Sequence, residues 1–238
     1  MKYRVPCCLL FVSLFAAQVG AAQDREFTVG VSGSMLVPTS ALSKRFVAAP
    51  GGSLFFFVNR GTPQWGAAFE YVKFSKLADN LSVSRPITDT VGGVPQKTFY
   101  QIPLPKLAMS LEMFGASVQA RYDAVRFGDL LVNIGFGAGI YRWTFKRNEY
   151  RDSLRVQTLR GVRTAAVLNV PALQQQDWSG GLNAGIDLVF RIADPVSVTG
   201  GARYKIIIGE LWPTLALDLE SVSTFQMLDL RAGISVDF

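Results

Sequence analysis

The chain has 238 residues, a formal charge of +6, no histidine and two cysteines, Cys7 and Cys8. This length allows one large β domain or two small ones. Without histidine, and with both cysteines in the N-terminal segment, the rest of the chain cannot form a Ser-His-Asp site, a cysteine nucleophile or a His/Cys metal site. After the N-terminal segment, no run reaches the roughly 18 consecutive apolar residues of a membrane-spanning helix.

The N-terminus has the features of a secretory signal peptide. Lys2 and Arg4 precede an apolar run over residues 6–17, and small residues follow. The apolar run is too short for a membrane anchor, so we expect cleavage after Ala22, with Ala21 as the alternative. Loss of Lys2 and Arg4 lowers the formal charge from +6 to +4. Residues 23–238 are then expected to form a single domain.

Eight segments predict β-strands, because apolar and polar residues alternate along most of them. In chain order they are Phe27–Val37, Ser53–Asn59, Trp65–Phe74, Phe114–Tyr122, Leu130–Tyr141, Trp178–Ile192, Val196–Ile208 and Leu228–Phe238. Long and short connections alternate between them, and the longest cover residues 75–113 and 142–177. Short turns at one end and long loops at the other are typical of transmembrane barrels.

The polar side of the strands is better suited to a narrow interior than to water. It carries small residues, such as Gly135, Gly137 and Gly139, and its positive and negative charges roughly balance. We therefore predict an all-β fold: a closed eight-stranded antiparallel up-and-down transmembrane barrel, with apolar side chains facing lipid. Arg142 breaks the parity of its strand and is expected at the outer rim, because an arginine at mid-bilayer costs about 2–4 kcal/mol.

Charged residues on the polar face form a candidate lumen network. They are Glu70, Arg121, Asp187, Arg191, Arg203, Lys205, Asp229, Arg231 and Asp237. One interpretation is a hydrogen-bonded plug, because an eight-stranded barrel is just wide enough for side chains to fill. The other is a narrow or gated pore, biased toward anions by its basic residues.

The loop over residues 142–177 carries a candidate basic patch. Its members are Lys146, Arg147, Arg151, Arg155, Arg160 and Arg163. The loop is either a solvated segment or a contact for lipopolysaccharide phosphates or an acidic host glycan, since arginine presents forked donors that match phosphate. No nucleic-acid-binding motif is present, so nucleic acid is not expected as a partner.

The signal peptide, the eight-strand layout and the final strand together resemble the OmpA/OmpX-type family of small outer-membrane barrels. The resemblance concerns architecture and not residue-by-residue motifs. It implies that Ile234, Val236 and Phe238 form a C-terminal signal read by the barrel assembly machinery. It also implies residence in the outer membrane of a Gram-negative cell, in contact with lipid and lipopolysaccharide.

Three functions fit these observations. The first is a structural or surface-interaction protein of the envelope, without catalysis or cofactor, whose outer loops bind a host or surface ligand. The second is a small porin-like channel for ions or small solutes. The third is a soluble periplasmic carrier similar to a lipocalin, with its apolar face inside.

Overall fold

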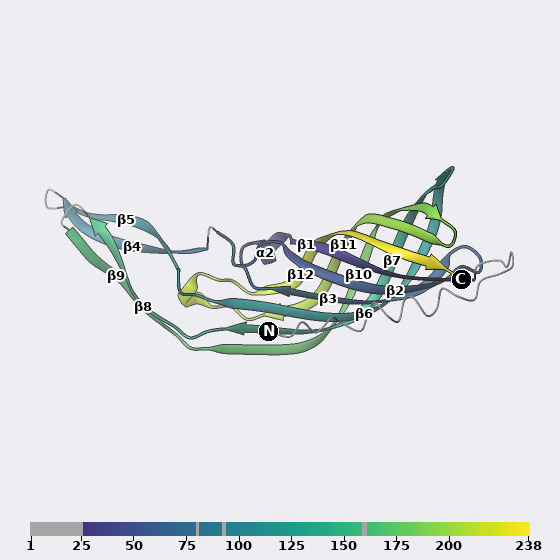
Figure 1. Cartoon of the computed structure of the whole chain (residues 1–238). Coiled ribbons are helices and arrows are strands. Elements are labelled where there is room, and N and C mark those ends of the chain that lie inside the picture. Colours follow the sequence, from purple (N-terminus) through teal and green to yellow (C-terminus); the bar gives the residue numbers. More distant parts are fainter. Residues whose placement is uncertain (1–25, 80, 92–93, 159–160) are drawn as a thin grey trace, which may run out of the picture.

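The computed structural model describes residues 26–238, except residues 80, 92–93 and 159–160. The expected signal peptide lies outside the described residues. Eight strands form a closed barrel in the order β1-β12-β11-β10-β7-β6-β3-β2, and all neighbouring pairs are antiparallel (Figure 1). The barrel strands are β1 (Phe27–Pro38), β2 (Ala49–Val58), β3 (Gln64–Phe74), β6 (Met109–Phe127), β7 (Leu130–Arg147), β10 (Leu173–Ala193), β11 (Val196–Leu211) and β12 (Val222–Asp237). The predicted fold class is confirmed, and each predicted strand corresponds to one barrel strand.

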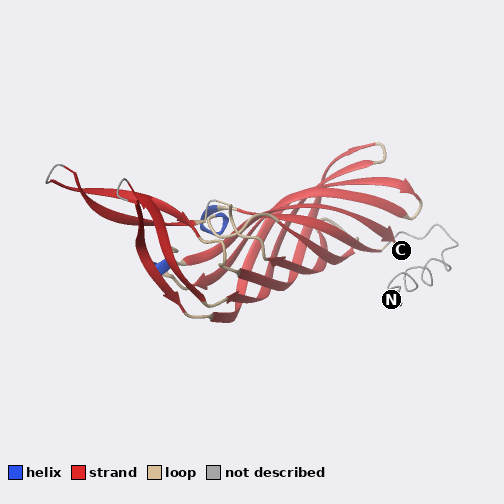
Figure 2. Cartoon of the chain, turned by 60° about the vertical axis from the view of Figure 1, so that its left-hand side comes forward, coloured by secondary structure: helices blue, strands red, loops and turns tan. Residues whose placement is uncertain are grey.

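The two longest connections are mostly β-structure and not irregular loops. One contains the hairpin β4 (Ser82–Val91) and β5 (Val94–Pro103), and the other contains β8 (Tyr150–Thr158) and β9 (Gly161–Val170). Both hairpins extend from the end of the barrel opposite the C-terminus (Figure 2). In transmembrane barrels the short turns are periplasmic and the long loops are outer. By this convention we name the hairpin end the outer end and the opposite end the periplasmic end.

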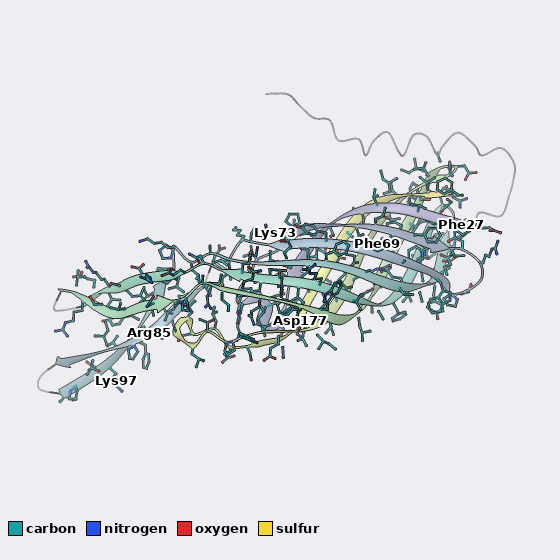
Figure 3. All side chains as sticks on the ribbon, turned by 90° about the horizontal axis from the view of Figure 1, so that it is seen from below. Phe27, Phe69, Lys73, Arg85, Lys97 and Asp177 are labelled. Atoms are coloured by element: carbon teal, nitrogen blue, oxygen red, sulfur yellow. The ribbon has the colours of Figure 1, made fainter. Side chains whose placement is uncertain are left out.

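The outer surface of the barrel is apolar over a broad band. Val31, Phe69, Phe136 and Ile234 point outward with 50–56% of their surface exposed, and Phe69 is labelled in Figure 3. No helix among the described residues is long and apolar enough to cross a membrane. Along β7 the band runs from Leu130 to Ile140, which is ten steps of about 3.3 Å. At a tilt of about 40° this gives roughly 25 Å, the height of the apolar band of a transmembrane barrel.

Above this band, the two faces of the same strands exchange character: the inward residues become apolar and the outward residues become polar. On β7 the inward glycines are followed by inward Tyr141, Trp143 and Phe145, each at most 3% exposed. The outward positions change from Ile140 to Arg142, Thr144 and Lys146. We call the part with apolar outward residues the membrane section, and the part above it the outer section. The outer section has the pattern of a water-soluble barrel, with apolar residues inside.

Neighbouring strands change at the same level. Going outward, the inward residue changes from polar to apolar at Ser34/Leu36 (β1), Glu70/Val72 (β3), Lys205/Ile207 (β11) and Asp229/Met227 (β12). These apolar residues form one buried cluster with Leu42, Phe46 and Leu217, which are 0–1% exposed. Leu42 belongs to helix α2 (Ser40–Ser43) and Leu217 to the 3-10 helix η1 (Leu215–Leu217). The two helical turns thus contribute to the apolar core of the outer section.

Candidate functional sites: the lumen and the outer loops

The lumen of the membrane section contains a buried ion-pair network centred on Asp187 of β10. Arg203 donates to Asp187 at 2.6 Å from β11, and Arg231 donates to the same carboxylate at 2.6 Å from β12. Arg203 is 1% exposed and Asp187 is 5% exposed. Arg203 also donates to Gln119 of β6, so the network joins strands on several sides of the barrel.

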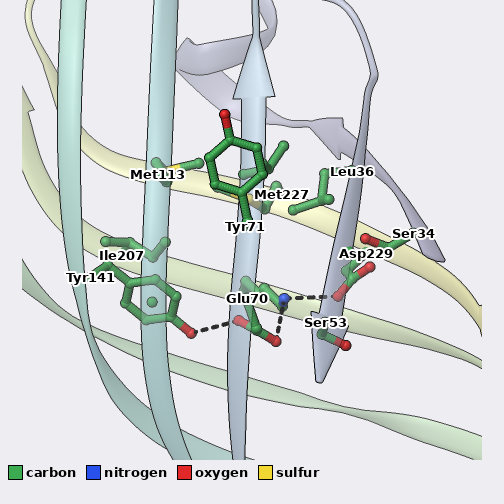
Figure 4. A pocket seen from close by; sticks show the side chains of 14 residues that line it. Ser34, Leu36, Ser53, Glu70, Tyr71, Met113, Tyr141, Ile207, Met227 and Asp229 are labelled. Atoms are coloured by element: carbon green, nitrogen blue, oxygen red, sulfur yellow. Dashed lines mark hydrogen bonds and ion pairs between the residues drawn. The ribbon is translucent and has the colours of Figure 1, made fainter. Parts of the chain in front are cut away.

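A second cluster lies at the boundary between the membrane and outer sections. Lys205 contacts Glu70 and Asp229, each at 2.8 Å, and the Tyr141 hydroxyl donates to Glu70 at 3.2 Å (Figure 4). The adjoining cavity has a volume of about 20 Å³. A cavity of that size holds about one water molecule. The lumen is therefore filled by side chains at this level.

Two glycines make room for these charges. A Cβ atom at Gly185 would lie 2.5 Å from Cγ of Arg203, and one at Gly201 would lie 2.3 Å from Oδ1 of Asp187. Both distances are shorter than any ordinary van der Waals contact between these atoms. The small residues of the polar face thus allow long charged side chains to cross a narrow lumen.

Three predicted members of the network lie apart from it. Arg121 is buried, but its guanidinium donates to Gln64 and lies 4.3 Å from the ring centre of Phe57. Arg191 is exposed at the periplasmic mouth, so its inclusion in the network was wrong. β10 continues past the interior there, and a register shift between Arg191 and Ala193 separates its end from the regular ladder. Asp237 is half-buried at the same mouth and accepts a hydrogen bond from Thr28 at 2.6 Å.

The predicted basic patch is divided between several surfaces. Arg151, Arg155 and Arg163 are exposed on the β8–β9 hairpin, where Arg151 pairs with Glu149. Lys146 is exposed on the outer wall of β7, and Arg160 lies outside the described residues. The exposed part of the patch is therefore smaller than the sequence predicted.

The assignment of Arg147 to this exposed patch was wrong. The residue ends β7 on its inward face and is 6% exposed. Its guanidinium donates to Thr214 Oγ1 and to the carbonyl of Pro171 at 3.1 Å. The alternation that places Trp143 and Phe145 inside the outer section places Arg147 there too.

Arg147 is one of three arginines that converge on the connection over residues 214–220. Arg45 donates to the carbonyl of Glu220, and Arg85 of β4 donates to the carbonyl of Ala216 at 2.6 Å. Arg85 also pairs with Asp218 at 2.9 Å. Arg45 is 2% exposed, and burial, reinforced by nearby Arg147, lowers its pKa to about 10, so it stays charged at neutral pH.

These contacts tie the first, second and third outer connections to the fourth. They could not be predicted from the sequence, because no local pattern links Arg45, Arg85 and Arg147 to a segment that is distant along the chain.

The C-terminal strand closes the barrel by pairing with β1. Ile234 is opposite Val31 in register and is 53% exposed on the outer surface, and Val236 is opposite Val29. The backbone of Phe238 exchanges hydrogen bonds with that of Phe27, at 2.8 and 3.1 Å. The pairing of β12 with β1 therefore closes the barrel.

The fold matches solved structures of outer-membrane proteins. A major outer membrane protein from Thermus thermophilus is similar with a TM-score of 0.50 and 10% identity, covering 89% of this chain and 99% of that one. Neisserial surface protein A has a TM-score of 0.45 and 15% identity over 90% and 97% of the two chains. Ail, the attachment invasion locus protein of Yersinia pestis, has a TM-score of 0.39 and 9% identity over 89% and 96%.

No protein-family model and no curated protein matches the sequence. The chain has the fold of the small eight-stranded barrels, similar to that of a solved outer-membrane protein, and the resemblance predicted from the sequence is confirmed at the level of architecture. The outward apolar band does not fit the alternative of a lipocalin-like carrier, whose apolar face would line the interior along the whole barrel.

Proposed function

We propose that the protein is a non-conducting surface-interaction barrel of a Gram-negative outer membrane. It reaches the membrane through a cleaved signal peptide, and its outer hairpins bind a ligand outside the cell. It performs no catalysis. The observation that carries this proposal is the filling of the lumen by two successive layers of side chains.

The first layer is the ion-pair network of Asp187, Arg203 and Arg231, in which each charge contacts an opposite one at hydrogen-bond distance. The second layer is the apolar core of the outer section, where Leu111, Phe225 and Met227 are fully buried. A permeating ion would have to separate buried charge pairs and then lose its hydration among hydrocarbon side chains. Both steps are costly, which supports a plugged barrel over a pore.

The outer hairpins combine cations with exposed apolar residues. Arg151 and Arg155 line a shallow pocket together with Val167, which is 74% exposed. Phe99 of the other hairpin is 68% exposed. Exposed apolar groups next to arginines are common at binding surfaces, and loops on a rigid scaffold often carry function. Phosphate groups of lipopolysaccharide or an acidic glycan match the charge of this surface.

Conductance in planar lipid bilayers tests the closed lumen. The purified protein is expected to insert without producing steady conductance steps. Arg203→Gln breaks the network but leaves the apolar core in place, so it is expected to remain non-conducting. Discrete steps in the wild-type protein that change size in Arg203→Gln would establish a channel instead.

Binding of heparin, as a model polyanion, to vesicle-inserted protein tests the surface role. The double variant Arg151→Gln and Arg155→Gln is expected to weaken binding, whereas Arg60→Gln, which removes an exposed arginine away from the hairpins, is the control. Equal loss in both variants, or no binding by the wild-type protein, argues against the hairpin surface.

The C-terminal strand is the proposed substrate of the barrel assembly machinery. Ile234 and Val236 alternate along β12 (Val222–Asp237), and the aromatic Phe238 follows directly after the strand. Phe238→Ala is expected to reduce the amount of heat-modifiable protein in the outer membrane of cells, while refolding of the purified variant into vesicles stays near wild type. An equal loss in both assays indicates a role in stability rather than in recognition.

A further inference from the structure

The periplasmic mouth of the barrel contains a polar cavity of about 240 Å³. Arg121, Asn133 and Gln64 line its walls, and the charged residues around it are Asp123, Arg126, Asp129, Arg191 and Asp237. The cavity lies at the opposite end from the outer hairpins, so its use is independent of the surface function proposed above.

Arg121 brings a buried positive charge into this cavity. It is 8% exposed, and its Nε and Nη2 atoms donate to Oε1 of Gln64 at 2.9 and 2.6 Å. Among the described residues, no carboxylate oxygen pairs with Arg121 within 4.0 Å, whereas the lumen bases Arg203, Lys205 and Arg231 each pair with an acid. The acceptor of these two hydrogen bonds is a neutral amide and the nearby acids form no ion pair with the guanidinium, so its remaining donors favour an added anion.

Asn133 supplies a second, independent indication of a ligand. The side chain is 0% exposed, and neither Oδ1 nor Nδ2 has a hydrogen-bond partner among the described residues. Buried amides are almost always hydrogen-bonded, because an unmade bond costs about 1–3 kcal/mol. Asn133 lines the same cavity as Arg121, so its unpartnered amide group is within the lining of the site.

We propose that this cavity binds a small monovalent carboxylate, which accepts hydrogen bonds from Arg121 and from Asn133 Nδ2. The planar fork of a guanidinium matches the two oxygens of a carboxylate. Asp123, Asp129 and Asp237 lie around the cavity and disfavour a doubly charged anion such as hydrogen phosphate. The volume suits a molecule between acetate and an amino acid in size, since pockets for drug-sized ligands begin at roughly 300 Å³.

Nuclear magnetic resonance of 15N-labelled protein in phospholipid nanodiscs tests the site. Sodium acetate is titrated against sodium chloride at equal ionic strength, and the signals of Arg121 Nε–H and the Asn133 side-chain amide are followed. Acetate is expected to shift both signals to saturation. Glycine, which carries the same group on a zwitterion, is expected to do the same, and phosphate is not.

Two variants make the test specific. Arg121→Gln is expected to weaken acetate binding about tenfold or more, the usual effect of losing a charge-assisted hydrogen bond. If Arg121→Gln does not fold, Asn133→Asp replaces it in the test. It adds a carboxylate that competes with acetate, so it is also expected to weaken acetate binding. Arg60→Gln is the control, because it removes an exposed arginine, paired with Glu26, outside the cavity lining.

Equal shifts with chloride, tighter binding of phosphate than of acetate, or unchanged acetate binding in the cavity variants overturns the proposal. Folding of each variant is checked by the difference in gel mobility between unheated and boiled samples. These results are independent of the conductance test: the carboxylate site can be absent from a non-conducting barrel, and it can be present in a conducting one.

Discussion

The change of side-chain alternation along β7 can be tested with two arginine substitutions on one strand. Ile134 and Thr144 both face outward, but Ile134 lies near the middle of the apolar band and Thr144 lies above Arg142. The two positions are ten residues apart, about 33 Å along the strand. Thr144 is also opposite Glu112 in register, an acidic neighbour for a new arginine.

The expected free energies follow from depth in the bilayer. An outward arginine costs about 2–4 kcal/mol at the bilayer midplane and about 0–1 kcal/mol near the interface. Ile134→Arg is therefore expected to destabilise the barrel about 2–3 kcal/mol more than Thr144→Arg. This corresponds to roughly 30- to 150-fold in the folding equilibrium constant, at 1.4 kcal/mol for each factor of ten.

Denaturant titration of the barrel in lipid vesicles measures this difference. The four tryptophans of the chain report unfolding by fluorescence, and gel mobility of unheated samples reports closed barrels. Equal stability of the two variants refutes the division into a membrane section and an outer section. A larger loss in Thr144→Arg than in Ile134→Arg refutes the assignment of the lipid-facing surface.

Three further changes test the interior and the outer connections. Asp187→Asn leaves Arg203 and Arg231 without their shared carboxylate and is expected to cost about 3–5 kcal/mol of unfolding free energy. Asp123→Asn, whose partner Arg126 lies 4.0 Å away at the exposed mouth, is expected to cost under about 1 kcal/mol. Similar losses in the two variants contradict the network. Leu111→Ala, at a fully buried position in the outer section, is expected to cost about 2–5 kcal/mol, whereas a loss near zero indicates that this core does not hold the barrel. Arg85→Gln removes the contacts to Asp218 and is expected to speed tryptic cleavage after Lys97; an unchanged rate shows that the hairpin is held by other contacts.

The barrel could be predicted from the sequence because its strands obey a rule that holds within each strand. Side chains alternate between lipid and lumen, so Leu228 to Phe238 showed both the strand and its two faces without knowledge of any partner. The same rule identified Asp187, Arg203 and Arg231 as inward charges. Which acid pairs with which base depends on the register between strands, and the sequence does not contain that information locally.

Two features of the outer end were missed although local signals existed. The alternation continues through Tyr141, Trp143 and Phe145, but with large apolar residues where glycines precede them. The sequence predicts a strand that ends at Tyr141 and a loop that contains Trp143 and Phe145, because Arg142 breaks the alternation of apolar and polar residues. The β4–β5 hairpin was missed in the same way, although its two strands flank Gly92-Gly93, a dipeptide typical of tight hairpin turns.

The three arginines that meet at residues 214–220 restrict how this segment can change in natural variants. Arg45 and Nη2 of Arg85 donate to the backbone carbonyls of Glu220 and Ala216. These acceptors are present whatever side chain occupies the two positions. Thr214 and Asp218 contribute side-chain oxygens, so their identity matters. Insertions or deletions would move all four acceptors together. Related sequences should therefore keep the length of this segment, with Thr214 and Asp218, while the residues between them diverge.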